Sequence, residues 1–271
     1  MIPQIFLEQW KREAPWQSIA MIEQDLIISR ALVDIYNHPI VAKDLVFRGG
    51  TALNKIYIKP QARYSEDIDL VQIEEGAIGE VIDAIRTSLA WLGEPKRKMT
   101  ERSVKLIYRY TSIDETPSKL KIEINTTEHF HVEPLIDVEY AVTSNWFSGK
   151  SILKTYSLDE LMATKLKALY QRRKGRDLFD LWLIVSRGLI NPSNVLKLFD
   201  VYCAHEDIKI TRALFEKSLY EKCQHTDFTM DMHPLLTKEQ KWGLNEALES
   251  VQEHLISKLQ GASYRLSEEL E

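Results

Sequence analysis

Two carboxylates close together in the sequence are the residues best suited to chemistry. Asp67 and Asp69 lie two positions apart in an otherwise apolar run. If that run is a strand, both side chains point to one face, and neighbouring carboxylates repel each other unless a cation lies between them. Mg²⁺ suits such a place, because it binds one or two carboxylates and completes its shell with water and substrate phosphates. The pair therefore predicts a metal site beside a phosphate-bearing substrate.

A glycine pair opens the stretch that leads to these carboxylates. Gly49 and Gly50 follow an apolar run and precede Thr51, at the start of a helical pattern. Glycine has no side chain to hold a ligand away from the backbone, and the free amide groups at a helix start bind anions. Either motif alone is common, but here they stand at the ends of two runs that predict adjacent strands. Together they indicate an amide cradle for phosphate next to a carboxylate pair for metal.

The apolar pattern predicts the elements that must position these motifs. Alternation and short apolar runs favour strands at 44–47, 66–73, 119–125, 136–142 and 152–156, with a basic strand or hairpin over 96–112. A helical period favours helices at 16–37, 50–58 and 77–92, and from Ser157 onward at 157–173, 176–187, 193–204, 211–222 and 238–260, before an acidic tail at 266–271. The sequence thus predicts an α+β protein, with a mixed-sheet domain at 1–156 and an all-helical domain at 157–271.

A second charged stretch lies in the helical half. Its positions from 165 to 176 hold six basic residues and no acidic one: Lys165, Lys167, Arg172, Arg173, Lys174 and Arg176. Lys165 lies near the apolar stripe of its helix, where an ammonium group either reaches water or meets buried anions. Asp177 and Asp180 share one face of the next helix, and Asp180 has apolar neighbours, so its carboxylate needs a partner. We expect Lys165 or an arginine of the basic run to be that partner.

Composition narrows the class of protein. The 271 residues carry a net charge of −5, which excludes nucleic-acid binding by bulk charge and leaves only a local basic patch for it. The N-terminus lacks the apolar core of a signal peptide, no run is apolar enough to span a membrane, and two distant cysteines suggest no disulfide framework. We therefore expect a cytoplasmic protein. The sequence contains no P-loop, Rossmann or protein-kinase motif.

The order of strand, GG-[ST], helix and D-x-D resembles the nucleotidyltransferase superfamily. The longer string GGTALNK…RYSEDIDL resembles the AbiEii/AbiGii toxin family, which includes the MenT-like nucleotidyltransferase toxins. A family pattern K-x-x-A-L…R-D-x-x-D-L is matched by the stretch from Lys165 or Lys167 to Asp180. The resemblance covers about residues 44–185. It implies a nucleotidyltransferase-fold domain followed by a helical domain, with the active site between them.

The resemblance also implies a third acid on a strand beside Asp67 and Asp69. Glu123 is the expected residue, in a strictly alternating strand, and Asp137 on the following strand is its rival. With Asp67 and Asp69, Glu123 is expected to be catalytic and to hold two Mg²⁺ ions. The strand pattern by itself leaves open an ordinary solvated glutamate.

Other site residues follow from the same resemblance. Lys165 and Asp180 are expected to be catalytic, although which of Lys165 and Lys167, and which of Asp177 and Asp180, form the active pair stays open. The expected nucleotide-binding residues are Arg48, Gly49, Gly50, Thr51, Ser65, Lys165 and Asp177, and the expected acceptor-binding residues are Lys167, Arg172, Arg173, Lys174 and Arg176.

The implied activity is Mg²⁺-dependent transfer of a nucleoside monophosphate from an NTP to an acceptor hydroxyl. By family analogy the acceptor is the 3′ end of an RNA, in particular tRNA, and the protein is the toxin of a toxin–antitoxin or phage-defence pair with a cognate antitoxin. Two alternatives stay open. One is a nucleotidyltransferase with a small-molecule or protein acceptor, which the overall acidity favours, and the other is a non-catalytic protein of the same fold that binds an NTP or a partner.

Overall fold

The chain divides into two compact units. The computed structural model describes residues 2–237 and 239–264, so the tail expected at 266–271 lies outside the described residues. One unit comprises Met1–Ser157 with Leu235–Gln240, and the other comprises Leu158–Pro234 with Lys241–Glu271. We call them the sheet unit and the helical unit.

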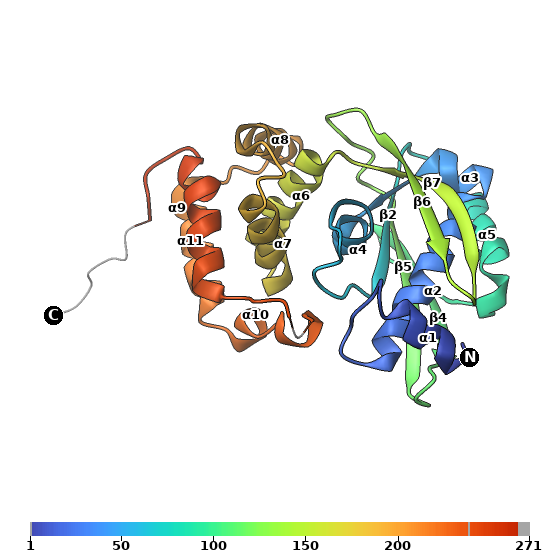
Figure 1. Cartoon of the computed structure of the whole chain (residues 1–271). Coiled ribbons are helices and arrows are strands. Elements are labelled where there is room, and N and C mark those ends of the chain that lie inside the picture. Colours follow the sequence, from blue (N-terminus) through green and yellow to red (C-terminus); the bar gives the residue numbers. More distant parts are fainter. Residues whose placement is uncertain (1, 238, 265–271) are drawn as a thin grey trace. The chain divides into compact units, whose positions relative to one another are not determined.

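The sheet unit is built on a mixed sheet of seven strands in the order β3–β4–β5–β2–β1–β7–β6 (Figure 1). The strands are β1 (Leu45–Arg48), β2 (Asp67–Gln72), β3 (Lys96–Met99), β4 (Ser103–Thr111), β5 (Pro117–Asn125), β6 (Ile136–Thr143) and β7 (Ser148–Thr155). β1 pairs antiparallel with β2, so the end of β1 meets the start of β2, while β2 and β5 are parallel. The expected neighbourhood of the two motif-bearing strands is confirmed, and β3 and β4 form the expected hairpin.

Helices bury one face of this sheet. They are α1 (Gln4–Trp10), α2 (Ile19–Tyr36), α3 (Pro39–Asp44) and α5 (Gly79–Ser88), with a 3₁₀ turn η2 at Ala90–Leu92 after α5. The short helix α4 (Gly49–Ala52) follows β1 directly and continues into a π-helical turn η1 at Leu53–Tyr57. The core joins Leu26 of α2 to Ile68 of β2 and Ile122 of β5, all fully buried. Since side chains alternate along a strand, the polar residues of β2 and β5 lie on the opposite face. The sequence did not predict α1.

The helical unit contains α6 (Leu158–Gln171), α7 (Gly175–Ser186), α8 (Pro192–His205), α9 (Arg212–Cys223), α10 (Thr226–Thr229) and α11 (Leu244–His254), with a 3₁₀ turn η4 (Ile256–Lys258) after α11. Another 3₁₀ turn, η3 (His233–Leu235), includes the point where the chain passes from the helical unit to the sheet unit. The expected α+β class is confirmed. The helix expected at 238–260 begins at Leu244, and residue 238 lies outside the described residues. A few residues earlier, within the sheet unit, the Tyr64 amide donates to the carbonyl of Leu235 at 2.8 Å, and Arg63 forms a β-bridge with Leu236.

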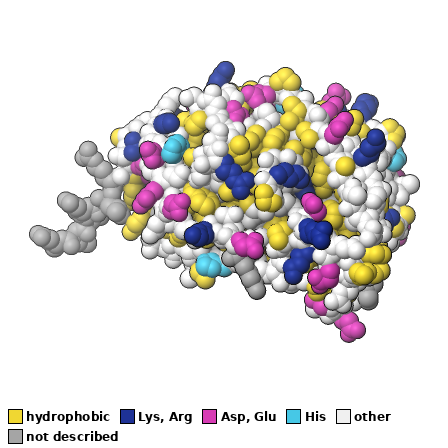
Figure 2. Space-filling view, viewed as in Figure 1, with side chains coloured by type: hydrophobic (Ala, Val, Ile, Leu, Met, Phe, Trp, Pro, Cys, Tyr) yellow, Lys and Arg dark blue, Asp and Glu magenta, His cyan; other side chains and the backbone are white. Residues whose placement is uncertain are grey.

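Charged side chains of both signs are interspersed on the face shown in Figure 2. A protein with this surface and a net charge of −5 does not attract polyanions through its overall field. Within the described ranges, no helix has both the length and the apolar character needed to cross a bilayer.

Candidate active site

The acidic residues of the first motif lie on the polar face of the sheet, at its centre. In the register of the parallel pair β2–β5, Asp67 is opposite Lys121 and Asp69 is opposite Glu123. The antiparallel pair β1–β2 sets Arg48 opposite Asp69. Because partners in register on paired strands share a face, these five side chains form one charged cluster.

Lysines meet the carboxylates of Asp67 and Glu123. The Lys121 ammonium lies 2.8 Å from Asp67 Oδ2 and 3.4 Å from Glu123 Oε2, and the Lys105 ammonium lies 3.0 Å from Glu123 Oε1. Burial opposes ionisation of Glu123, but the two lysines outweigh it and hold its pKa below the ordinary value. The sequence did not indicate that these two lysines belong to the site. Their alternation with apolar residues predicts which face of the sheet they lie on, but not which side chains they contact.

Among the described residues, Asp69 has no comparable ion pair. Burial and the nearby Asp67 carboxylate raise the pKa of Asp69, and Arg48 and Lys121 only partly offset them. Arg48 is itself bonded to Glu128, which belongs to the loop after β5. A further cation close to Asp69 would therefore stabilise the ionised form of its carboxyl group.

The charged cluster fits Mg²⁺ by its chemistry. Asp67 and Asp69 offer oxygen ligands on one face, and Mg²⁺ needs no more than one or two carboxylates when substrate phosphates supply the rest. Among the described residues, however, no three or more His, Cys, Asp and Glu side chains are already arranged around a metal position. The Lys121 ammonium lies where a cation would contact Asp67 and Glu123, so metal binding there requires this lysine to turn away.

The glycine pair is explained by two side chains that pack against it. A Cβ at Gly49 would lie 2.4 Å from Asp69 Oδ2, and a Cβ at Gly50 would lie 2.3 Å from a guanidinium nitrogen of Arg63. Gly49 also has φ = +80°, a conformation that residues with a side chain rarely adopt. Gly49 therefore allows the start of α4 to lie directly against the Asp69 carboxylate, and Gly50 leaves room for the Arg63 guanidinium.

Hydrogen bonds connect α4 with the start of β2. The hydroxyl of Thr51 bonds to the Ser65 hydroxyl at 2.7 Å and donates to the carbonyl of Asp67. Asn54 donates to the Gly50 carbonyl at 2.9 Å, and its side-chain oxygen accepts from the amide of Arg63 at 3.4 Å. The Thr51 hydroxyl thus bonds within the fold to the backbone of Asp67, and its expected contact with phosphate stays a prediction.

A buried ion pair fixes the helical segment after the glycines. Lys55 of η1 lies 2.7 Å from Asp25 Oδ1 and donates to the Ser29 hydroxyl at 3.0 Å, both on α2. The same Asp25 carboxylate accepts from the indole nitrogens of Trp10 and Trp16, at 2.9 and 3.2 Å. The lysine of the GGTALNK string is therefore a structural residue in this unit.

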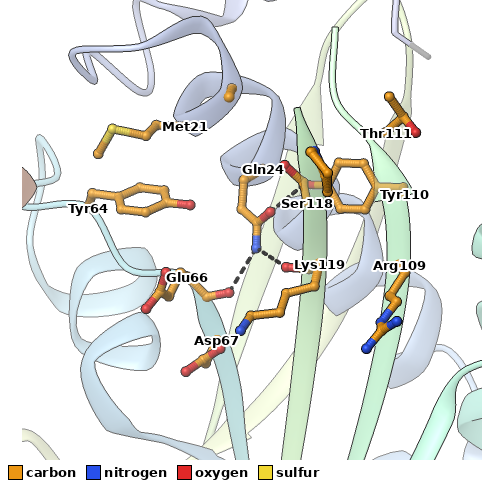
Figure 3. Close-up of a pocket in the computed structure, with 12 residues that line it drawn as sticks. Met21, Gln24, Tyr64, Glu66, Asp67, Arg109, Tyr110, Thr111, Ser118 and Lys119 are labelled. Carbon is orange, nitrogen blue, oxygen red and sulfur yellow. Dashed lines mark hydrogen bonds between the residues drawn. The ribbon is translucent and has the colours of Figure 1, made fainter. Parts of the chain in front are cut away.

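A cavity of about 640 Å³ opens beside Asp67 (Figure 3). It lies at the end of the sheet where β4 ends and β5 begins, and it is lined by Ala20, Met21, Gln24, Tyr64, Glu66, Asp67, Arg109, Tyr110, Thr111, Pro117, Ser118 and Lys119. None of these residues except Asp67 was singled out from the sequence.

Asp137, the rival third acid, lies away from this cluster. It belongs to β6, at the edge of the sheet, and the strands β1 and β7 separate β6 from β2. Glu123, by contrast, is directly opposite Asp69 on the adjacent strand. Sheet order, which the sequence pattern does not contain, therefore favours Glu123.

The helical unit contains its own charged cluster. The Lys165 ammonium lies 2.7 Å from Asp180 Oδ2 and 3.2 Å from Asp177 Oδ1, and all three side chains are buried. Arg172 forms two bonds to Asp177, at 2.6 and 2.8 Å. Burial opposes ionisation of Asp177, but Lys165 and Arg172 outweigh it and lower its pKa. Arg172 thus pairs with Asp177, and Lys165 lies closer to Asp180 than to Asp177.

The basic run has acidic partners within the same unit. Lys167 bonds to Glu206, Arg172 to Asp177, Arg173 to Asp227 at 3.2 Å, and Arg176 to Asp231 at 3.1 Å, while Lys174 precedes α7 as its N-cap residue. The excess of positive charge seen in the sequence is therefore largely matched once the chain folds.

The central sheet, the glycine turn after β1 and the carboxylates on β2 define a nucleotidyltransferase-like fold. The chain is similar in structure to MenT4, a nucleotidyltransferase toxin from Mycobacterium tuberculosis H37Rv, with a TM-score of 0.59 and 18% identity over 96% of this chain and 91% of that one. It is also similar to a candidate nucleotidyltransferase from H. pylori, with a TM-score of 0.53 and 18% identity over 86% of this chain and 92% of that one.

Family membership follows from the sequence comparison. Residues 30–250 match the family described as nucleotidyl transferase AbiEii toxin, type IV toxin–antitoxin system, and the chain belongs to this family. No curated protein matches it significantly. Membership of this nucleotidyltransferase toxin family implies an NTP substrate and an antitoxin partner.

Proposed function

We propose that this toxin transfers a nucleoside monophosphate from an NTP to the 3′-terminal hydroxyl of tRNA, and that Mg²⁺ is required. The observation that carries the proposal is the position of Asp67, Asp69 and Glu123 on one face of adjacent strands, with Gly49 in contact with Asp69. This combination of carboxylates and glycine backbone suits a triphosphate with its metal ions.

The chemistry is a displacement at the α-phosphorus. The acceptor oxygen forms a bond to the α-phosphorus, the bond between the α-phosphorus and the bridging oxygen to the β-phosphorus breaks, and pyrophosphate leaves. The backbone amides of Gly49 and Gly50 bind the leaving phosphates, and Arg48 adds positive charge beside them. The hydroxyl proton passes to Glu123, which its two lysines keep ionised in the free protein.

Asp67 and Asp69 are the residues that would hold Mg²⁺, with Glu123 as the third ligand. The bound ions would supply charge neutralisation at the triphosphate and would lower the pKa of the acceptor hydroxyl. Thr51 and Ser65 contribute by fixing the backbone at Asp67. Lys121 must release Asp67 and Glu123 for this arrangement, and its ammonium is then available to the phosphates.

In the helical unit, we assign Lys165 and Asp180 to the reaction and Asp177 to structure. Arg172 forms two bonds to Asp177, whereas the Lys165 ammonium lies closer to Asp180 than to Asp177. Glu206 binds Lys167 in a separate ion pair. Lys165→Met is expected to lose transfer more strongly than Lys167→Met.

The testing experiment is a transfer assay with one matched pair of variants. Purified protein is incubated with Mg²⁺, each α-³²P-labelled NTP in turn, and tRNA, and the products are separated into RNA, protein and small molecules. Asp69→Asn is compared with Asp137→Asn, since both remove one strand carboxylate from the sheet unit. We expect label on tRNA with wild type and Asp137→Asn, and none with Asp69→Asn.

Other outcomes would contradict parts of the proposal. Label on protein or on a small molecule alone would reject tRNA as the acceptor. Equal transfer by the two variants would reject the metal role of Asp69. Transfer that persists with excess EDTA would reject the requirement for Mg²⁺.

A further inference from the structure

The cavity beside Asp67 lies on one particular side of the carboxylates. β2 has β1 as its neighbour on one side and β5 on the other. The glycine turn follows β1, whereas the cavity is lined by the end of β4, the start of β5 and the residues Tyr64 and Glu66 that precede β2. Phosphates at the glycines and an occupant of the cavity would therefore lie on opposite sides of Asp67.

The geometry of phosphoryl displacement assigns that far side to the second substrate. In such reactions the attacking and leaving oxygens lie roughly in line through the phosphorus. If pyrophosphate leaves toward Gly49 and Gly50, the acceptor hydroxyl approaches from the side of β5. Glu123 lies on this side too, opposite Asp69 on β5.

Two cations line the cavity from paired strands. Arg109 and Lys119 are directly opposite in the β4–β5 register, and both are exposed. Neither forms a salt bridge with a carboxylate of the described residues, unlike Lys105 and Lys121 further along the same strands. Like charges directly opposite on paired strands are destabilising, so an anion between them would be favoured. Figure 3 shows Lys119 extending toward Asp67, while Arg109 stands on the neighbouring strand.

The other wall of the cavity is apolar and firmly held. Met21 and the ring of Tyr64 form it, and the Tyr64 ring packs edge-on against Trp16 with 5.9 Å between the ring centroids. The Gln24 amide donates to the carbonyls of Glu66 and Lys119, at 3.0 and 2.8 Å, and so joins the two sides of the rim (Figure 3). A preformed cavity with an aromatic wall and two cations matches a nucleotide, which presents a flat base and a phosphate.

We propose that this cavity binds the 3′-terminal nucleotide of the acceptor RNA. Arg109 and Lys119 contact its phosphates, Tyr64 and Met21 lie against its base, and the terminal hydroxyl points toward Asp67. The inference rests on the proposed function for the identity of the reaction, and it moves acceptor binding from the basic run of the helical unit to the sheet unit. Because Arg109 and Lys119 are both cationic, they also disfavour a cationic small-molecule acceptor such as an aminoglycoside.

The test uses two double variants of equal charge change. Arg109→Glu with Lys119→Glu alters the cavity, and Arg12→Glu with Lys150→Glu alters exposed positions elsewhere in the sheet unit. Binding of a tRNA labelled with fluorescein at its 5′ end is measured by anisotropy at several salt concentrations, without NTP. We expect at least ~10-fold weaker binding for the cavity variant only, and a slope of log K against log [salt] reduced by about 2, because two phosphate contacts are lost. Where transfer occurs, the KM for tRNA is expected to rise in the cavity variant while the KM for NTP stays unchanged.

The outcomes separate this inference from the proposed function. Equal weakening by both double variants, or no tRNA binding by wild type, would overturn the cavity assignment. A rise only in the KM for NTP would indicate that the cavity binds the NTP nucleoside, and this result would also overturn the cavity assignment. tRNA binding that depends on the cavity, without transfer, would support the cavity assignment and reject the proposed nucleotidyl transfer. Equal transfer to tRNA by wild type and the cavity variant would support the proposed transfer and reject the cavity assignment.

Discussion

Loss of the Lys55 ammonium is expected to destabilise the sheet unit strongly. Lys55→Met would leave the Asp25 carboxylate, which is 1% exposed, without its cation at 2.7 Å. Removing one partner of a buried ion pair costs ~3–5 kcal/mol, because the remaining charge is uncompensated. Two indole N–H groups still donate to Asp25, so we expect the lower end of this range, about 3 kcal/mol.

Native-state hydrogen exchange of the α2 amides measures this effect within the sheet unit alone. A loss of about 3 kcal/mol corresponds to exchange roughly 150-fold faster, at 1.36 kcal/mol for each factor of ten. Lys43→Met is the matched control, because its lysine is 85% exposed and lies 3.9 Å from Asp44. The double variant Asp25→Asn with Lys55→Met should lose less than the sum of the single variants. A loss below ~1 kcal/mol for Lys55→Met, or strict additivity, would refute the structural role of this pair.

Three further predictions concern other sites. Burial lowers the pKa of Lys222 from 10.5 to about 8, so between pH 8 and 10.5 the unfolded chain binds more protons than the folded chain. The free energy of unfolding of wild type, relative to that of Lys222→Met, should therefore rise with pH across this window in denaturant titrations. A difference that does not change with pH would contradict this prediction. Gly49→Ala should cost about 1–3 kcal/mol and displace Asp69, abolishing transfer, whereas Gly79→Ala, which meets no atom within 4 Å, should be neutral or stabilising in the same unfolding and transfer assays. Glu123→Gln should slow transfer at least ~100-fold, and a rate near that of wild type would exclude Glu123 as the proton acceptor.

Much of the fold could be predicted from local patterns. The strict alternation of β5 gave the correct face for Glu123, because Leu120, Ile122 and Ile124 are all fully buried. The change from alternating to helical period near Ser157 correctly separated a sheet from a helical region. These features depend only on neighbours in the sequence, which is why periodicity captures them.

The arrangement around the site could not be predicted in the same way. Sheet order places β5 between β2 and β4, which gives Asp67 and Glu123 their lysine partners. The same order puts β1 and β7 between β2 and Asp137 on β6. The acidic partners of the basic run could not be predicted either, since Glu206 and Asp231 come from distant segments. Long-range pairing decides which charges remain available for a substrate.

The most direct test of nucleotidyl transfer follows the two ends of the triphosphate separately. The preferred NTP is supplied with ³²P at either the α- or the γ-phosphate, together with Mg²⁺ and tRNA, and both RNA and released phosphates are counted. We predict that only the α-label enters RNA, that the γ-label leaves as pyrophosphate in equal amount, and that Asp69→Asn does neither. Label from the γ-phosphate on RNA, or release of phosphate without labelled RNA, would contradict the proposed reaction.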